Sequence, residues 1–205
     1  MTAPSLRAMT MADLNSVVKI HQQAFQGFFL EQMGTSFLKA YYRIALAYSG
    51  SVAHVYVGKG GFVEGFAVGF VAPKAFYEEL KTSRMQLFLP LFLGVIRNPN
   101  LCIKIFENIK RVSNSESVSS KILEDKDTAE LSSIAVGSAA KGTGSLLIDA
   151  FIKDVWSRKI ENITLTTDYE DNELVNNFYL KHGFTRCGVD VRKGRKLWRY
   201  ILTKG

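Results

Sequence analysis

The sequence has few cysteines and no long apolar run. Its only two cysteines, Cys102 and Cys187, lie too far apart for the paired spacing of a zinc site or a disulfide framework. The most apolar stretch, residues 85–96, contains Pro90 and is shorter than the roughly 20 residues that a membrane-spanning helix needs. Residues 1–14 lack the apolar core of a signal sequence. We therefore expect a cytoplasmic protein with no transmembrane segment.

The composition predicts one folded domain with a positive charge. The chain has 205 residues, of which 47% are apolar, enough for one sizeable core, so we expect a single domain over residues 1–205. It carries 26 Lys and Arg against 19 Asp and Glu, a formal charge of +7. This excess favours a polyanionic partner or ligand, and nucleic acid, a phosphorylated cofactor and an anionic membrane surface all satisfy it. The three histidines show no ligand spacing, so we expect no metal.

Strand and helix patterns follow one another along the chain. Strands are predicted at residues 6–9, 129–136, 162–167 and 196–202, a hairpin at 53–71, and helices at 14–25, 36–48, from about 145, and 172–183. A helical insertion is predicted at about 73–127. This order indicates an α/β (α+β) fold in which helices cover a sheet.

Two glycines lie in the turn after strand 129–136. Gly142 and Gly144 precede a helical pattern, and the free N–H groups and dipole of a helix start favour an anion. The triphosphate-loop pattern GxxxxGK[ST] fails because Thr143 replaces its lysine, and the dinucleotide pattern GxGxxG fails at Leu147. The alternative is a tight turn that binds nothing.

Two motifs occur in order, KGTGSLL at residues 141–147 and NELVNNFYLKHGF at 172–184. Together they resemble the GNAT superfamily of acyl-CoA-dependent N-acetyltransferases. The resemblance covers most of the chain except about 75–127. It implies a mixed, mostly antiparallel central sheet flanked by helices, with the helical insertion before the fourth strand, and an enzyme that uses acetyl-CoA as co-substrate without a metal.

The resemblance also implies where acetyl-CoA binds. The pyrophosphate is expected at Lys141, Gly142, Thr143, Gly144 and Ser145. Ala139 stands where the family usually has Gln or Arg, so Lys141 replaces part of that charge. The family's pantetheine pairs with the backbone of a splayed strand, here Ile134, Ala135 and Val136. Asn172 matches an asparagine that contacts the cofactor's arm in the family, and a helix cap is its alternative role.

Two residues are the catalytic candidates. Tyr179 matches the tyrosine that protonates the departing thiolate in the family, and its alternative is a buried aromatic in a helix whose core stripe is Leu174, Val175 and Phe178. Glu130 lies on the strand where some members carry a general base, and its alternative is a solvated strand-end carboxylate. Water, Glu64 and Asp168 are the remaining candidates for the base.

The motifs favour an enzyme that transfers acetyl to a primary amine by direct attack in a ternary complex. A basic nucleic-acid-binding module is an alternative, although no aromatic-interleaved basic motif supports it. A CoA-binding sensor without activity is another, since the family's Gln or Arg is missing. The insertion, with Phe76, Tyr77, Phe88 and Phe92, is open to three roles: the wall of an acceptor pocket, a cover for the core, or a homodimer contact. It favours a small acceptor such as an amino-sugar over a protein tail.

Overall fold

A seven-stranded sheet forms the centre of the computed structural model, which describes residues 3–83, 125–137, 140, 142–192 and 195–205. Its strands are β1 (Ser5–Ala8), β2 (Ser51–Val57), β3 (Val63–Val71), β4 (Thr128–Val136), β5 (Asn162–Asp168), β6 (Thr185–Arg192) and β7 (Arg195–Thr203). They lie in the order β1-β2-β3-β4-β5-β7-β6. Only the β4–β5 pair is parallel among these strands. The predicted mixed, mostly antiparallel sheet is confirmed.

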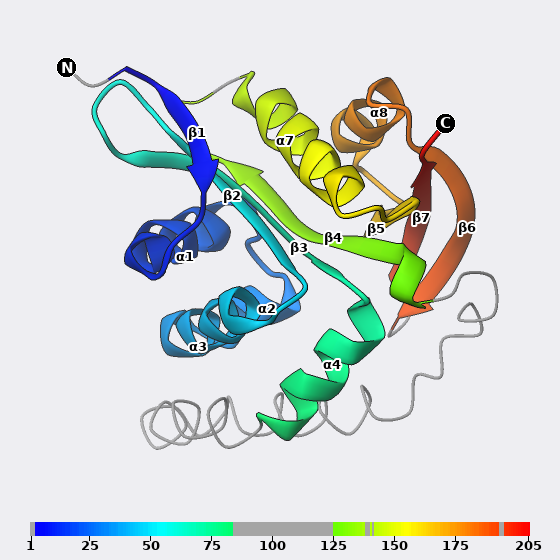
Figure 1. Cartoon of the computed structure of the whole chain (residues 1–205), viewed down its shortest axis with the longest axis horizontal. Coiled ribbons are helices and arrows are strands. Elements are labelled where there is room, and N and C mark those ends of the chain that lie inside the picture. Colours follow the sequence, from blue (N-terminus) through cyan, green and yellow to red (C-terminus); the bar gives the residue numbers. More distant parts are fainter. Residues whose placement is uncertain (1–2, 84–124, 138–139, 141, 193–194) are drawn as a thin grey trace.

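Helices cover both faces of the sheet (Figure 1). They are α1 (Leu14–Ala24), α2 (Phe29–Gln32), α3 (Thr35–Ala47), α4 (Pro73–Thr82), α7 (Thr143–Ser157) and α8 (Glu173–Lys181), with short 3-10 turns at Met11–Asp13 and Asp125–Asp127. The first four lie on one face, and α7 and α8 lie on the other. Among the described helices, none has the length and hydropathy of a membrane span.

Each face of the sheet carries its own buried apolar cluster. The first cluster lies under α1 and α3 and includes Phe66 and Phe70 of β3. The second lies under α7 and α8 and includes Leu131 of β4 and Leu165 of β5. Near the end of β4 the side chains alternate, because Ala135 enters the first cluster while Ile134 and Val136 pack against the second.

A β-bulge in β4 opens the sheet at its centre. Val68 pairs with Ser133 and Gly69 pairs with Leu131, so Ser132 is an extra residue without a partner on β3. A Cβ on Gly69 would lie 2.1 Å from the carbonyl oxygen of Glu130, so only glycine fits this close approach. On the other edge of β4, pairing with β5 ends at Glu130. The two parallel strands diverge from that point.

The predicted insertion is described only at its two ends. Helix α4 begins it, and Phe76 stacks on Phe70 with ring centroids 3.5 Å apart, so this part of the insertion covers the first core cluster. Phe88 and Phe92 lie outside the described residues. The single domain over residues 1–205 stays a prediction.

Asp13 ties the first strand to the start of α1. Its carboxylate accepts two hydrogen bonds from the Arg7 guanidinium, at 2.7 and 2.8 Å, and one from the backbone N–H of Thr10 at 2.8 Å. These bonds favour the charged form, and the Arg7 contact above all lowers the pKa of Asp13 to about 2 from 3.8.

We predict that Asp13→Asn destabilises the protein by about 1–2 kcal/mol at pH 7, because the charge-assisted bonds are lost. A depressed carboxyl pKa contributes stability that is present above pH 4 and lost as the pH falls towards about 2. Urea unfolding across this range measures both effects. The control is Asp149→Asn, whose side chain is 65% exposed. Equal pH slopes for the parent and Asp13→Asn would contradict the prediction.

Candidate functional site

The turn between β4 and α7 has the geometry of an anion site. Gly142 is the residue before the helix and has φ = +90°, which favours glycine. The helix begins at Thr143, so the predicted start near Ser145 was too late. The reason is local, since the Thr143 hydroxyl and N–H both donate to the Ala140 carbonyl, at 2.7 and 3.2 Å. Lys141 lies outside the described residues.

Space is open above this turn. A Cβ at Gly142 would meet nothing within 4 Å, whereas one at Gly144 would make an ordinary contact with the Phe178 ring at 3.6 Å. The next N–H groups, of Gly144 and Ser145, belong to the first helical turn and have no acceptor within the helix. The turn can therefore offer donors and the positive end of a dipole to a phosphate.

The gap between β4 and β5 begins beside this turn. Ile134, Ala135 and Val136 pair with β3 along one edge, and along the other edge they have no partner on β5. Ala135 packs in the first core cluster, and Ile134 and Val136 pack against the second. Their side chains hold the strand, while the backbone edge towards β5 is available to an extended ligand, as the prediction for these residues requires.

Tyr179 is buried beside the diverging strands. Only 6% of it is exposed, and it shares the second core cluster with Leu131 and Leu165. Burial raises the pKa of Tyr179 above its ordinary value, and Tyr200 adds to the effect, so the hydroxyl keeps its proton at neutral pH.

The predicted core stripe of α8 was wrong at Leu174 and Val175, whereas Phe178 packs against the second core cluster. Leu174 is 87% exposed and Val175 is 39% exposed, while the helix buries Asn176 and Tyr179. Asn176 can be buried although its side chain is polar, because its amide has hydrogen-bond partners. Its amide donates to the Asp168 carbonyl at 3.3 Å, and its oxygen accepts from the Tyr200 hydroxyl at 2.9 Å.

Asn172 precedes α8 and is bound to the neighbouring strand. Its side-chain amide donates to the Thr167 hydroxyl at 2.6 Å, and its carbonyl accepts the N–H of Asn176. Asn172 occupies the N-cap position of α8, as its alternative role predicted, although its side chain makes no cap bond. Asn176, four residues on, was missed by sequence reasoning, although its position on the same helical face as Asn172 was a usable signal.

Glu130 lies at the point where β4 and β5 separate, on the face of α1, α3 and α4. It is half-buried, and it accepts a 2.6 Å hydrogen bond from the Tyr77 hydroxyl of α4. This contact differs from the predicted alternative of a freely solvated carboxylate. Tyr77 was placed in the insertion by sequence, but its contact with Glu130 was not predicted.

The other two candidate bases are held elsewhere. Both carboxylate oxygens of Asp168 accept hydrogen bonds from Arg195. Glu64 lies next to Gly65, which pairs with Val136 at the far end of β4 from Glu130. Their positions leave Glu130 as the carboxylate at the opening.

Two tyrosines of α3 hold the bulge from the first face. The Tyr41 hydroxyl lies 3.0 Å from Ser132 Oγ. The neighbouring Tyr42 hydroxyl contacts Ser133 and lies 2.7 Å from Nδ1 of the buried His21. Burial lowers the pKa of His21 to about 4, so the ring is neutral at pH 7 and adds no charge behind the opening.

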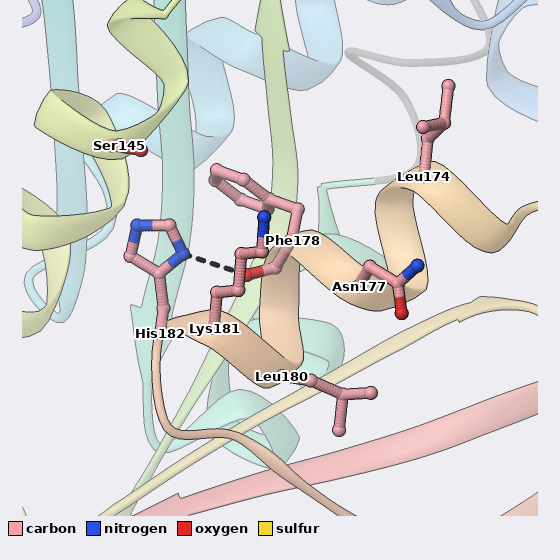
Figure 2. Close-up of a pocket in the computed structure, with 7 residues that line it drawn as sticks. All are labelled: Ser145, Leu174, Asn177, Phe178, Leu180, Lys181 and His182. Atoms are coloured by element: carbon pink, nitrogen blue, oxygen red, sulfur yellow. Dashed lines mark hydrogen bonds between the residues drawn. The ribbon is translucent and has the colours of Figure 1, made fainter.

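A groove of about 610 Å³ runs between the start of α7 and α8. Figure 2 shows Ser145 on α7 facing Phe178, with Lys181 and His182 further along. His182 Nδ1 lies 2.8 Å from the Phe178 carbonyl. Since Phe178 also lies against Gly144, the groove continues from the glycine turn.

Several basic residues near the C-terminus are paired within the chain. Arg186 lies over Trp198 at 4.5 Å, and Lys196 lies over Tyr169 at 5.6 Å. Arg195 binds Asp168 and also lies 4.2 Å from the centre of the Phe28 ring. These contacts keep the guanidinium and ammonium groups close to the sheet, which does not favour an extended nucleic-acid surface.

Within the described residues, no group of three His, Cys, Asp or Glu side chains is arranged to hold a metal ion. Cys187 is exposed and free, and Cys102 lies outside the described residues.

Residues 93–184 match the family model of the acetyltransferase (GNAT) family. The chain contains a GNAT acetyltransferase domain. The resemblance drawn from the two motifs is confirmed, and both motifs lie inside the matched range. The match begins within the predicted insertion, which the resemblance had left out. No curated protein matches the sequence.

Three solved structures share the fold of this chain. A ribosomal-protein-alanine N-acetyltransferase from Brucella melitensis has 15% identity and a TM-score of 0.61, covering 98% of this chain and 99% of its own. A spermidine N-acetyltransferase chimera from Vibrio cholerae and hSSAT has 14% identity and a TM-score of 0.61, with 98% of this chain and 96% of its own covered. The protein yncA from Salmonella typhimurium, solved with its cofactor acetyl-CoA, has 14% identity and a TM-score of 0.59, with 98% and 94% covered.

Proposed function

We propose that the protein transfers an acetyl group from acetyl-CoA to a primary amine of a small molecule, by direct attack in a ternary complex. The observation that carries the proposal is the gap between β4 and β5, which has Glu130 at its closed end and the glycine turn at its open end. An extended thioester fits such a gap because strand edges pair with extended chains.

In the proposed complex, the parts of acetyl-CoA follow one another along the open edge of β4, the glycine turn and the groove between α7 and α8. Its pyrophosphate is bound at residues 141–145 by the first N–H groups of α7, and its pantetheine pairs with the open edge of β4 at residues 134–136. The nucleotide end occupies the groove between α7 and α8, where Lys181 supplies a positive charge. Asn172, at the start of α8, contacts the arm. Relatives of the same fold include one solved with its cofactor acetyl-CoA.

Glu130 and Tyr179 divide the proton transfers between the two faces of the sheet. Bound acetyl-CoA supplies a thioester carbonyl for the amine to attack. Glu130, on the face of α4, takes the proton that the amine releases, directly or through water. Tyr179, on the face of α8, gives its hydroxyl proton to the departing sulfur. One proton is taken and one is given, so the enzyme returns to its starting state when Glu130 releases its proton and Tyr179 regains one.

The acceptor is a small amine such as an amino-sugar. Helix α4 supports this, since Tyr77 lies at Glu130 and walls the opening on the acceptor side. Relatives of the same fold include enzymes named for a ribosomal protein and for spermidine, so protein and polyamine amines are the competing classes. A cytoplasmic location stays part of the proposal.

We predict that Gly142→Asp weakens CoA binding at least about tenfold, because the new side chain strains a backbone with φ = +90° and repels the pyrophosphate. Gly144→Asp adds the charge alone. Gly144→Ala is the matched control, because its Cβ makes only an ordinary contact. Calorimetric titration with CoA measures the affinities. Unchanged affinity in both folded Asp variants would mean that the pyrophosphate binds elsewhere.

We predict amine-dependent release of CoA from acetyl-CoA, reduced about 100- to 10,000-fold by Tyr179→Phe. The substitution removes only the hydroxyl, so CoA affinity and melting temperature should change little. Tyr169→Phe, at an exposed tyrosine, is the control. CoA binding without release for any amine would instead indicate a sensor. Full turnover in Tyr179→Phe, with chemistry rate-limiting, would assign the proton to water.

We predict that Glu130→Gln lowers kcat and moves or removes the acidic limb of the pH–rate profile, because the amide keeps the shape and loses the basicity. One acceptor must be used throughout, since its own amine titrates. Glu64→Gln should leave the profile unchanged. If Glu130→Gln behaves like the parent, the base is water or another carboxylate.

A further inference from the structure

The sheet face that carries Glu130 continues over β5, β7 and β6. On this face the contacts of α1, α3 and α4 are with β2, β3 and β4, where the side chains are buried. Further along, Thr164, Thr166 and Arg199 are half-exposed. A half-exposed floor therefore extends sideways from the opening at Glu130, with Ile201 beside Thr164 and the Arg199 guanidinium as its basic group.

Strand register places Arg199 on this floor. Glu130 pairs with Thr164, and Thr166 pairs with Arg199. Adjacent strands lie about 4.8 Å apart and each residue rises about 3.3 Å, so the Cα atoms of Glu130 and Arg199 are about 12 Å apart. Both side chains project from the same face: Glu130 meets Tyr77 of α4, and the Arg199 guanidinium lies over Gly188 of β6. An acceptor that contacts both groups must therefore span β5 and β7.

Gly188 makes room for the Arg199 guanidinium. A Cβ at Gly188 would lie 2.7 Å from Nη2 and 3.4 Å from Cζ. Gly188 does not have a positive φ, so its backbone does not require glycine. Its lack of a side chain instead lets the guanidinium lie flat against β6, 22% exposed.

Only part of the hydrogen-bonding capacity of the Arg199 guanidinium is used by the described residues. Nη2 lies 3.4 Å from an oxygen of Asp190, longer than the about 2.7–2.9 Å of a charge-assisted hydrogen bond. Nε is buried and has no hydrogen-bond partner within the part of the chain that the structure describes. A guanidinium is planar and binds carboxylate or phosphate oxygens through two parallel N–H bonds, which makes such a group the complementary ligand.

We infer that Arg199 binds an anionic group of the acceptor, while the acceptor's amine reaches Glu130. The acceptor class is thus an amine that carries a carboxylate or a phosphate at its other end. The inference rests on the proposed function and adds a specificity determinant to it. The alternative is that the carboxylates of Asp190 and Glu130 favour acceptors that carry only positive charge.

Matched pairs of acceptors test the inference. Lysine is compared with cadaverine, and glucosamine 6-phosphate with glucosamine, by the acetyl-CoA-dependent release of CoA. The anionic member of at least one pair should have the higher kcat/KM, by about tenfold or more, and the pair that responds identifies carboxylate or phosphate. Arg199→Gln should raise KM for that member about 10- to 100-fold, the effect of losing a charged hydrogen-bonding partner. The KM of the counterpart without the anionic group should change less than about twofold.

Two further variants separate this role from net charge and from folding. Lys196→Gln removes the same charge from the same strand, but Lys196 lies over Tyr169 on the opposite face, so its acceptor preference should equal the parent's. Gly188→Ala keeps the charge and displaces the guanidinium, so it should also raise KM for the anionic member alone. CoA affinity, measured by calorimetry, should be unchanged in all three variants.

The outcomes distinguish the inference from the function on which it rests. Equal kcat/KM within both pairs, or a preference for cadaverine and glucosamine, overturns the role of Arg199 and leaves acetyl transfer standing. An equal loss for both members of a pair in Arg199→Gln also overturns it. If CoA is released with none of the four amines, while spermidine or a peptide amine does release it, the acceptor class is wrong. If no amine releases CoA, both proposals are wrong.

Discussion

The bulge at Ser132, opposite Gly69, is the constraint on which the site depends. It adds one residue to β4 relative to β3, and a bulge bends its strand. Pairing with β5 stops at Glu130, two residues earlier. Only glycine allows the close approach that the bulge requires, and Tyr41 holds the bulge from α3. The position of Glu130 and the opening itself are therefore consequences of strand register.

Local patterns predicted most of the fold. The strand at β4, the glycine turn and the motif around Tyr179 each depend on residues close in sequence. The bulge could not be predicted, because it is a property of two strands in register. The contact between Tyr77 and Glu130 joins positions 53 residues apart, and it too needs the folded sheet. The exact start of α7 depended on hydrogen bonds of Thr143 that composition does not reveal.

The error in α8 has a different physical origin. The helix has apolar residues on more than one face, and the hydrophobic pattern selected Leu174 and Val175. Asn176 is buried instead, because its side-chain hydrogen bonds link the end of β5 to Tyr200. A buried amide with two partners has no unsatisfied group to oppose its burial. Leu174 remains exposed at the rim of the groove, where apolar surface adjoins the turn.

The open edge of β4 connects stability to binding. Its side chains enter both core clusters, as Ala135 does on one face and Ile134 on the other, so the strand needs no partner on β5 to stay in place. Its backbone groups towards β5 still need hydrogen-bond partners, because unpaired backbone polar groups are costly when they are shielded from water. Water can satisfy them while the gap is open. An extended ligand can satisfy them while excluding water, and the same exclusion would strengthen the electrostatic interactions of Glu130 and Tyr179 in the proposed reaction. The sheet therefore keeps one open internal edge, on β4 beyond Glu130, which an extended ligand can complete.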